Sequence, residues 1–173
     1  MKKSKTLFTL LIAGALMASC GGGKDNTKTA ERPLTVAMAT EIDSLDPFNA
    51  TAGDTKTVMD QIFDGLLDVD EDGNLVPDLA ESYEISEDGL TYTFKLKEGV
   101  KFHDGSDFTA EDAAASCEAY SSSQNVSGSW WAGELKCKVI DDYTFTITPA
   151  SGKPLGSLVN MLCSTPIMSA DDL

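Results

Sequence analysis

The segment LTYTFKLK, residues 90–97, has the most regular pattern in the chain. Apolar side chains occupy every second position, and threonine or lysine fills the positions between them. This alternation is typical of a β-strand with one buried and one solvated face. The segment SYEI, residues 82–85, precedes it across the turn sequence Glu87-Asp88-Gly89, so a β-hairpin is predicted here. The apolar positions of the second strand are Leu90, Tyr92, Phe94 and Leu96.

Further elements are expected on both sides of this hairpin. A second hairpin is predicted for residues 136–147, with its turn at Asp141-Asp142. Thr109 and Asp112 have the spacing of a capping box, which predicts a helix from residue 110 to about residue 120. A strand is expected at residues 34–39 and a short helix at 155–162. Apolar side chains recur at helical spacing over residues 54–67, which predicts an amphipathic helix that closes near Gly65. Together these elements predict a modest domain of mixed α/β (α+β) class.

The acidic segment DVDEDG, residues 68–73, imitates the start of an EF-hand calcium loop. The twelfth position of that loop should be a bidentate glutamate, but it is Leu79, and Pro77 interrupts the approach to it. A solvated turn between two short strands is therefore the preferred interpretation. A calcium-dependent module, or a surface lipoprotein that binds no ligand, is the alternative.

The N-terminus has the features of an export signal. The basic residues of MKKSK, 1–5, are followed by the apolar run LFTLLIAGALMA, 7–18, which is too short to span a membrane. Met17-Ala18-Ser19-Cys20 resembles the bacterial lipobox, which implies lipidation of Cys20 and anchoring at the extracytoplasmic face of the cell membrane. The polar, glycine-rich residues 21–32 are predicted to form a flexible linker.

The charge balance excludes some partners. The chain has 13 Lys and Arg against 28 Asp and Glu, a net charge of −15. Loss of residues 1–20 would remove three lysines and lower the charge to about −18. Such an acidic chain is not expected to bind nucleic acid, whose phosphates need basic side chains, or to adsorb to anionic lipid by charge alone.

Residues suited to catalysis or metal binding are scarce. The only histidine, His103, lies in the turn-like sequence His103-Asp104-Gly105 without a visible acid/base partner, so no enzyme activity is expected. Cys117, Cys137 and Cys163 match no zinc or CxxC spacing. An exported chain could pair two of them, with Cys117 and Cys137 the favoured pair, or could bury three free thiols. No cofactor or metal is predicted.

Several motifs occur in one order along the chain: LDP at 45–47, FDGL at 63–66, GNLVPDLAES at 73–82, DGLTYTF at 88–94, KEGVKFHDG at 97–105 and FTAED at 108–112. This order resembles the family-5 extracytoplasmic solute-binding proteins of peptide- and nickel-type ABC transporters. The resemblance implies the N-terminal part of a two-lobed, periplasmic-binding-protein type II-like fold, in which two lobes close on a ligand. Members are much longer, so a chain with one incomplete lobe is expected to bind ligand weakly.

The resemblance also implies a division of the chain: signal peptide 1–20, linker 21–32, first strand of lobe I 33–48, small extra domain 49–150 and truncated return toward lobe I 151–173. It implies that the protein captures oligopeptides, dipeptides or another small solute outside the membrane and delivers them to an ABC permease. The ligand-facing segment begins just after the LDP turn and maps to Thr51, Ala52 and Gly53. Trp130 and Trp131 are further candidates, because exposed aromatic side chains suit a ligand cleft, although one of them could equally belong to the core.

Overall fold

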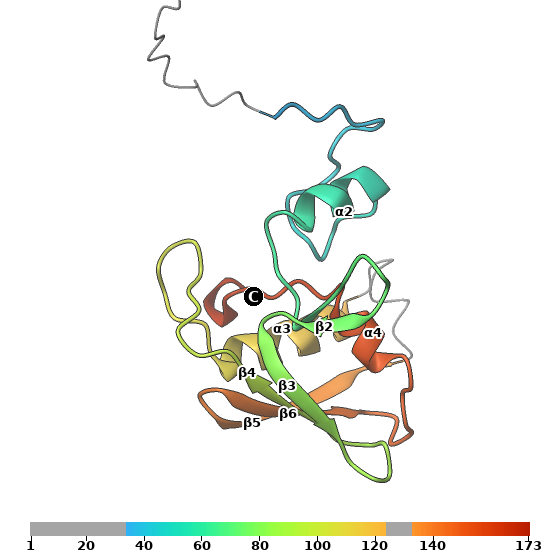
Figure 1. Cartoon of the computed structure of the whole chain (residues 1–173), viewed down its shortest axis with the longest axis vertical. Coiled ribbons are helices and arrows are strands. Elements are labelled where there is room, and N and C mark those ends of the chain that lie inside the picture. Colours follow the sequence, from blue (N-terminus) through green and yellow to red (C-terminus); the bar gives the residue numbers. More distant parts are fainter. Residues whose placement is uncertain (1–33, 124–132) are drawn as a thin grey trace, which may run out of the picture. The chain divides into compact units, whose positions relative to one another are not determined.

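The computed structural model describes residues 34–123 and 133–173. The chain divides into two units, residues 1–37 and 38–173, and every described helix and strand lies in the second unit (Figure 1). The elements are, in chain order, α2 (Gly53–Met59), β1 (Leu67–Val69), β2 (Leu75–Pro77), β3 (Ala80–Ile85), β4 (Tyr92–Leu96), α3 (Ala110–Ser122), β5 (Leu135–Asp141), β6 (Thr144–Pro149), α4 (Leu158–Leu162) and the 3₁₀ helix η2 (Ala170–Asp172). The mixed α/β class is confirmed.

The main sheet has four antiparallel strands in the order β3-β4-β6-β5. Both predicted hairpins are confirmed, since β3 pairs with β4 and β5 pairs with β6. The turn of the first hairpin places Gly89 at a φ of +69°, a conformation that residues with a side chain rarely adopt. Pairing of β4 with β6 joins the two hairpins into one sheet.

An aromatic stack crosses three strands of this sheet. Phe94 lies opposite Tyr83 on one side and Phe145 on the other, with ring centroids 5.6 Å apart in both pairs. Phe94 and Phe145 are fully buried, and so is Leu96. The strict alternation of residues 90–97 therefore points its apolar side chains into the core, as predicted.

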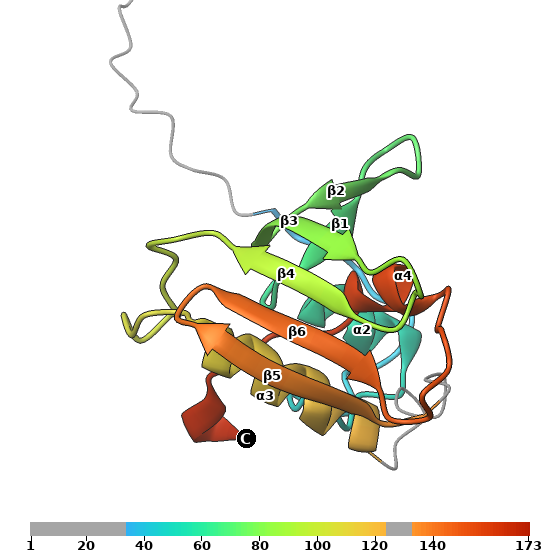
Figure 2. The same cartoon turned by 90° about the horizontal axis from the view of Figure 1, so that it is seen from below.

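Helix α3 covers one face of the sheet beneath β5 and β6 (Figure 2). Its start is fixed by the predicted capping box, in which the Thr109 N–H donates to Asp112 Oδ2 at 2.9 Å. The buried face of the helix consists mainly of small side chains, which allow its backbone to approach the strands closely. These buried small residues are Ala110, Ala113, Ala114, Ser116, Cys117 and Ser121.

The C-terminal segment is attached to α3 through polar side chains of the helix. Asp112 uses its second oxygen, Oδ1, to accept the N–H of Ala170 at 2.9 Å. Ser116 Oγ accepts the Met168 N–H at 2.9 Å and donates to the Met168 carbonyl at 3.1 Å. Each of these side chains is buried, so the hydrogen bonds satisfy groups that would otherwise be costly to remove from water.

The acidic segment 68–73 forms the predicted turn between two short strands, β1 and β2. The Asp70 carboxylate accepts the backbone N–H groups of Asp72 and Asn74 at 3.0 and 2.8 Å. Leu79, which stands where a calcium loop needs its glutamate, is buried in the core.

Two sequence-based expectations were wrong in extent. The helix that was expected to close near Gly65 ends at Met59, and the FDGL segment that follows packs Gly65 against the end of α4. A side-chain carbon on Gly65 would lie 2.9 Å from the Leu162 carbonyl oxygen, so only glycine fits this close approach. The helix expected at 155–162 begins later, at Leu158.

The strand expected at residues 34–39 is not formed. A strand needs a neighbour for its backbone hydrogen bonds, and none of the described strands pairs with this segment. Leu34 and Val36 are 90% and 71% exposed. The alternating pattern is present in the sequence, but local alternation cannot supply the missing partner.

The central position of the aromatic stack gives a test of the core. Replacement of Phe94 by alanine should lower the free energy of unfolding by about 3–5 kcal/mol, because it removes a fully buried ring from between two others. Chemical denaturation followed by circular dichroism measures this loss. The exposed Glu84→Ala variant on β3 is the control and should change stability by less than about 0.5 kcal/mol. Equal effects of the two substitutions would contradict this core assignment.

Candidate functional site

The loop that follows the LDP turn is organised by the carboxylate of Asp43. One oxygen of this group, Oδ2, accepts the Thr51 N–H at 3.0 Å, the Ala52 N–H at 2.9 Å and the Thr51 hydroxyl at 2.6 Å. The Asp43 N–H in turn donates to the hydroxyl oxygen of the buried Thr55 at 3.0 Å. The Asp43 carboxylate therefore fixes the backbone of Thr51 and Ala52, and the Thr55 hydroxyl fixes the backbone of Asp43, on the two sides of the bend that leads into α2.

A second aspartate ties the preceding residues to the same helix. Asp54 Oδ2 accepts the Thr40 N–H at 2.5 Å and the Thr40 hydroxyl at 2.8 Å. Residues 40–55 thus form one hydrogen-bonded unit with carboxylates at its centre and threonines around them. We call this unit the Asp–Thr loop.

The hydrogen bonds of the Asp–Thr loop stabilise its carboxylates in the charged form. The pKa of Asp43 is held far below its ordinary value, first by the hydroxyl of Thr51 and then by that of Thr55 and the Thr51 N–H. The pKa of Asp54 is lowered by the Thr40 hydroxyl and then by the Thr40 N–H. Both aspartates are therefore negatively charged at any physiological pH.

The predicted ligand-facing residues Thr51, Ala52 and Gly53 lie at the end of this loop, where α2 begins. Thr51 and Gly53 are exposed, and Ala52 is partly buried. The N–H groups of Thr51 and Ala52 already donate to Asp43, so an extended peptide can bind them only by displacing or sharing that carboxylate. The other predicted site residues, Cys20, Trp130 and Trp131, lie outside the described residues.

A small cavity of about 50 Å³ adjoins the Asp–Thr loop. Pro47, Ala50 and Lys56 line it, together with Tyr120 of α3 and Thr165 of the C-terminal segment. The loop is therefore next to a hollow whose walls come from three distant parts of the sequence.

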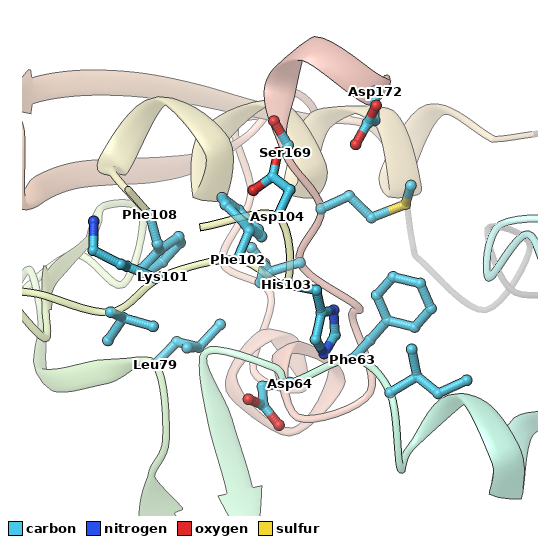
Figure 3. Close-up of a pocket in the computed structure, with 14 residues that line it drawn as sticks. Phe63, Asp64, Leu79, Lys101, Phe102, His103, Asp104, Phe108, Ser169 and Asp172 are labelled. Atoms are coloured by element: carbon cyan, nitrogen blue, oxygen red, sulfur yellow. The ribbon is translucent and has the colours of Figure 1, made fainter. Parts of the chain in front are cut away.

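A larger cavity of about 260 Å³ lies between the FDGL segment, the loop around His103 and the C-terminal segment (Figure 3). Apolar side chains, among them Phe63, Leu79 and Phe108, form part of its wall. His103 reaches the side of the cavity where Phe63 and Asp64 lie. Its remaining polar lining residues are Lys101, Asp104, Ser169 and Asp172.

Two of these polar side chains take part in hydrogen bonds of the protein itself. Asp104 accepts the N–H and the hydroxyl of Ser106 at 2.9 and 2.7 Å, which lowers the pKa of its carboxyl group. Lys101 Nζ lies 2.6 Å from Asp107 Oδ1. With three aspartates and one paired lysine in its wall, the cavity favours a neutral or cationic guest over an anionic one.

Sequence reasoning assigned His103 to a turn and did not anticipate this cavity. The turn is present, since the Gly105 N–H donates to the Phe102 carbonyl at 2.9 Å. The cavity was missed because its walls come from segments about 40 to 105 residues apart, which no local pattern links.

The described part of the chain has neither a cluster of metal-ligating side chains nor a helix suited to a bilayer. Among residues 34–123 and 133–173, no group of three or more His, Cys, Asp or Glu side chains could hold a metal ion. No helix within the same ranges is long and apolar enough to cross a bilayer.

The lowered pKa of Asp43 gives a pH-dependent prediction. Because the folded-state pKa is below the ordinary 3.8, the carboxylate stabilises the loop fully above that value and loses this effect as the pH falls below it. Amide exchange of Thr51 and Ala52, followed by NMR, should therefore accelerate relative to the intrinsic rate only below pH 3.8. An Asp43 titration midpoint at or above 3.8 would contradict the assigned hydrogen bonds.

Two variants serve as controls for this measurement. Asp43→Asn should raise the exchange of both amides already at neutral pH, because the charged acceptor is lost. Glu41→Gln, which changes an exposed neighbouring carboxylate, should leave the exchange as it is.

Comparison with known sequences identifies the relatives of this chain. The sequence profile described as "Bacterial extracellular solute-binding proteins, family 5 Middle" matches residues 74–172. The glutathione-binding protein GsiB of Escherichia coli K12 is 35% identical over 158 residues, which cover 90% of this chain and 29% of GsiB. The chain thus spans about 29% of the length of the curated relatives it matches.

Solved structures give the same result. The solute-binding protein AgaA of A. tumefaciens R10, in complex with agropinic acid, has a TM-score of 0.69 at 30% identity, covering 77% of this chain and 27% of AgaA. NikZ of Campylobacter jejuni, in complex with Ni(L-His), has a TM-score of 0.66 at 29% identity, covering 75% and 26%. The oligopeptide-binding protein AppA of Bacillus subtilis, in complex with a nonapeptide, has a TM-score of 0.64 at 27% identity, covering 73% and 25%.

These matches confirm the resemblance derived from the ordered motifs and the expected fold. They are to transporter binding proteins rather than enzymes. The chain belongs to family 5 of the bacterial extracellular solute-binding proteins.

Proposed function

We propose that this chain is part of the substrate-binding component of an ABC importer and that its solute is a peptide. The observation that carries the proposal is the family match, together with a glutathione-binding relative aligned over 90% of the chain. Glutathione is a modified tripeptide, and AppA is named for binding oligopeptides. Other neighbours bind agropinic acid or Ni(L-His), so the peptide is the class shared by two of these relatives.

The proposed ligand contacts are Thr51, Ala52 and Gly53 of the Asp–Thr loop, with Trp130 and Trp131. An extended peptide can bind to backbone groups as an added strand would. The Asp43 carboxylate occupies the N–H groups of Thr51 and Ala52, which holds them in a fixed direction. A peptide carbonyl that takes over one of these donors would meet a preorganised backbone, which reduces the entropy lost on binding.

We further propose the division implied by the family. Residues 33–48 and 151–173 would belong to lobe I, and residues 49–150 to a small extra domain. A ligand held between two lobes stabilises the closed state only through contacts that differ between the open and closed states. Delivery of the solute to a membrane permease follows closure.

Isothermal titration calorimetry with glutathione, dipeptides and oligopeptides tests this function. A version of the protein extended to the length of its relatives should bind at least one peptide with micromolar affinity, about −8 kcal/mol. Residues 1–173 alone should bind more weakly, because only one set of contacts is present. Ni(L-His) and agropinic acid serve as comparison ligands.

One outcome would contradict the choice of a peptide as solute, and another would contradict the need for two lobes. Tight binding of a comparison ligand without peptide binding would overturn the peptide assignment. Micromolar peptide binding by residues 1–173 alone would overturn the requirement for two lobes.

The lipid anchor on Cys20 is also proposed, from the lipobox-like sequence Met17-Ala18-Ser19-Cys20. An acyl anchor would keep an acidic protein near its permease at the extracytoplasmic face of the membrane, where charge alone would not hold it. In a bacterial host, metabolic labelling with an alkyne fatty acid should label the wild-type chain in the membrane fraction. The Cys20→Ala variant should lose the label, whereas the control Cys163→Ser should keep it. Retention of label by Cys20→Ala would contradict the anchor.

A further inference from the structure

Helix α3 and strand β5 are joined by side-chain to backbone hydrogen bonds. The Leu135 N–H donates to Ser121 Oγ at 3.0 Å, and the Cys137 N–H donates to Glu118 Oε1 at 2.7 Å. A serine side chain is short, so the first bond brings the backbone of α3 close to that of β5. The small buried residues of α3 make this approach possible.

The same contact places two cysteines opposite each other. Cys117 precedes Ser121 by four residues, one helical turn or about 6 Å back along the same face of α3. Cys137 follows Leu135 by two residues, about 6.6 Å along β5 on the same face of the sheet. The two hydrogen bonds pair Ser121 with Leu135 and Glu118 with Cys137, so the helix and the strand run in opposite directions here. Cys117, one turn before Ser121, therefore lies opposite Cys137, two residues after Leu135.

The environment of the thiols agrees with this geometry. The pKa of the Cys137 thiol is raised well above its ordinary value, first by a hydrogen bond with Cys117 and then by burial. Cys117 is fully buried and Cys137 is partly buried. Cys163 lies elsewhere, beside α4, where its thiol donates to the Val159 carbonyl at 3.7 Å.

We propose that Cys117 and Cys137 form a disulfide bond that joins α3 to β5. Structural disulfides form and persist in exported proteins, and this chain belongs to an extracellular family. The proposal relies on the location outside the cytoplasm that is part of the proposed function, but not on peptide binding. The bond would close a loop of about 20 residues, which restricts the unfolded chain.

Formation of the bond requires an external disulfide as oxidant, either an oxidised thiol–disulfide oxidoreductase or glutathione disulfide. The Cys137 thiolate attacks one sulfur of the external disulfide, forms a mixed disulfide and releases one thiolate. The Cys117 thiolate then attacks the Cys137 sulfur and releases the second. The cysteine pair loses two electrons and two protons, and the external disulfide becomes two thiols. Cys137 reacts first because it is the more accessible of the two. The thiolate is the attacking species, so the raised pKa of Cys137 slows this step at neutral pH, and the step becomes faster as the pH rises.

Peptide mapping of the full chain tests the proposal. The reduced, folded chain is incubated with glutathione disulfide, denatured, alkylated and digested without reduction. We expect one linked pair of peptides that contains Cys117 and Cys137, with Cys163 alkylated. The linked chain should unfold about 5–12 °C higher than the reduced chain by differential scanning calorimetry.

Matched variants identify the residues responsible. Cys163→Ser should keep both the link and the thermal shift, and Cys137→Ser should lose both while retaining the circular dichroism spectrum of the fold. Full alkylation of Cys117 and Cys137 in the folded wild-type chain after oxidation would overturn the proposal. A link from either residue to Cys20 or Cys163 would also overturn it. Because no peptide is present, these outcomes are independent of whether the proposed transport function is correct.

Discussion

The register between β3, β4 and β6 is the constraint on which the rest of this structure depends. It places Tyr83, Phe94 and Phe145 side by side, and the resulting stack joins two hairpins that are separated by 38 residues of sequence, 97–134. A shift of one residue in either pairing would turn Phe94 or Phe145 toward solvent, because side chains alternate between the two faces. The sheet in turn provides the surface against which α3 packs, and α3 holds the C-terminal segment through Asp112 and Ser116. That segment supplies part of the wall of both described cavities.

Polar side chains divide their hydrogen-bonding capacity between local and long-range partners in this fold. Asp112 caps α3 with one oxygen and binds Ala170 with the other, so the same carboxylate starts the helix and attaches the end of the chain. Asp43 instead concentrates three donors on a single oxygen. The first arrangement is buried and serves packing, whereas the second is exposed and orders a loop that the family resemblance links to ligand binding.

The features that sequence reasoning predicted are those that local patterns encode. Alternation in residues 90–97 identified a strand, and the spacing of Thr109 and Asp112 identified the start of α3, because both patterns act within a few residues. The end of α2 was not predicted, since the residues that follow it lead to Gly65, which packs against the carbonyl of Leu162, almost 100 residues away. The alternating segment at 34–39 shows the converse, because a strand pattern without a pairing strand stays exposed. The larger cavity was not predicted either, because its walls come from segments that meet only in the folded chain.

Helix α3 contacts β5, the C-terminal segment and the walls of both cavities. Its small buried face allows the helix to lie close to β5, and this closeness brings Cys117 to Cys137 and Ser121 to the Leu135 backbone. The other end of the same helix carries Asp112, which binds the C-terminal segment that forms part of the larger cavity. Tyr120 of α3 lines the smaller cavity beside the Asp–Thr loop.

Substituting larger side chains on the buried face of α3 would therefore move the walls of both cavities together, since packed layers shift as units rather than deform residue by residue. The conformation of the proposed ligand loop is thus determined locally by Asp43, while the packing of α3 on the sheet positions Tyr120 in the wall of the adjoining cavity.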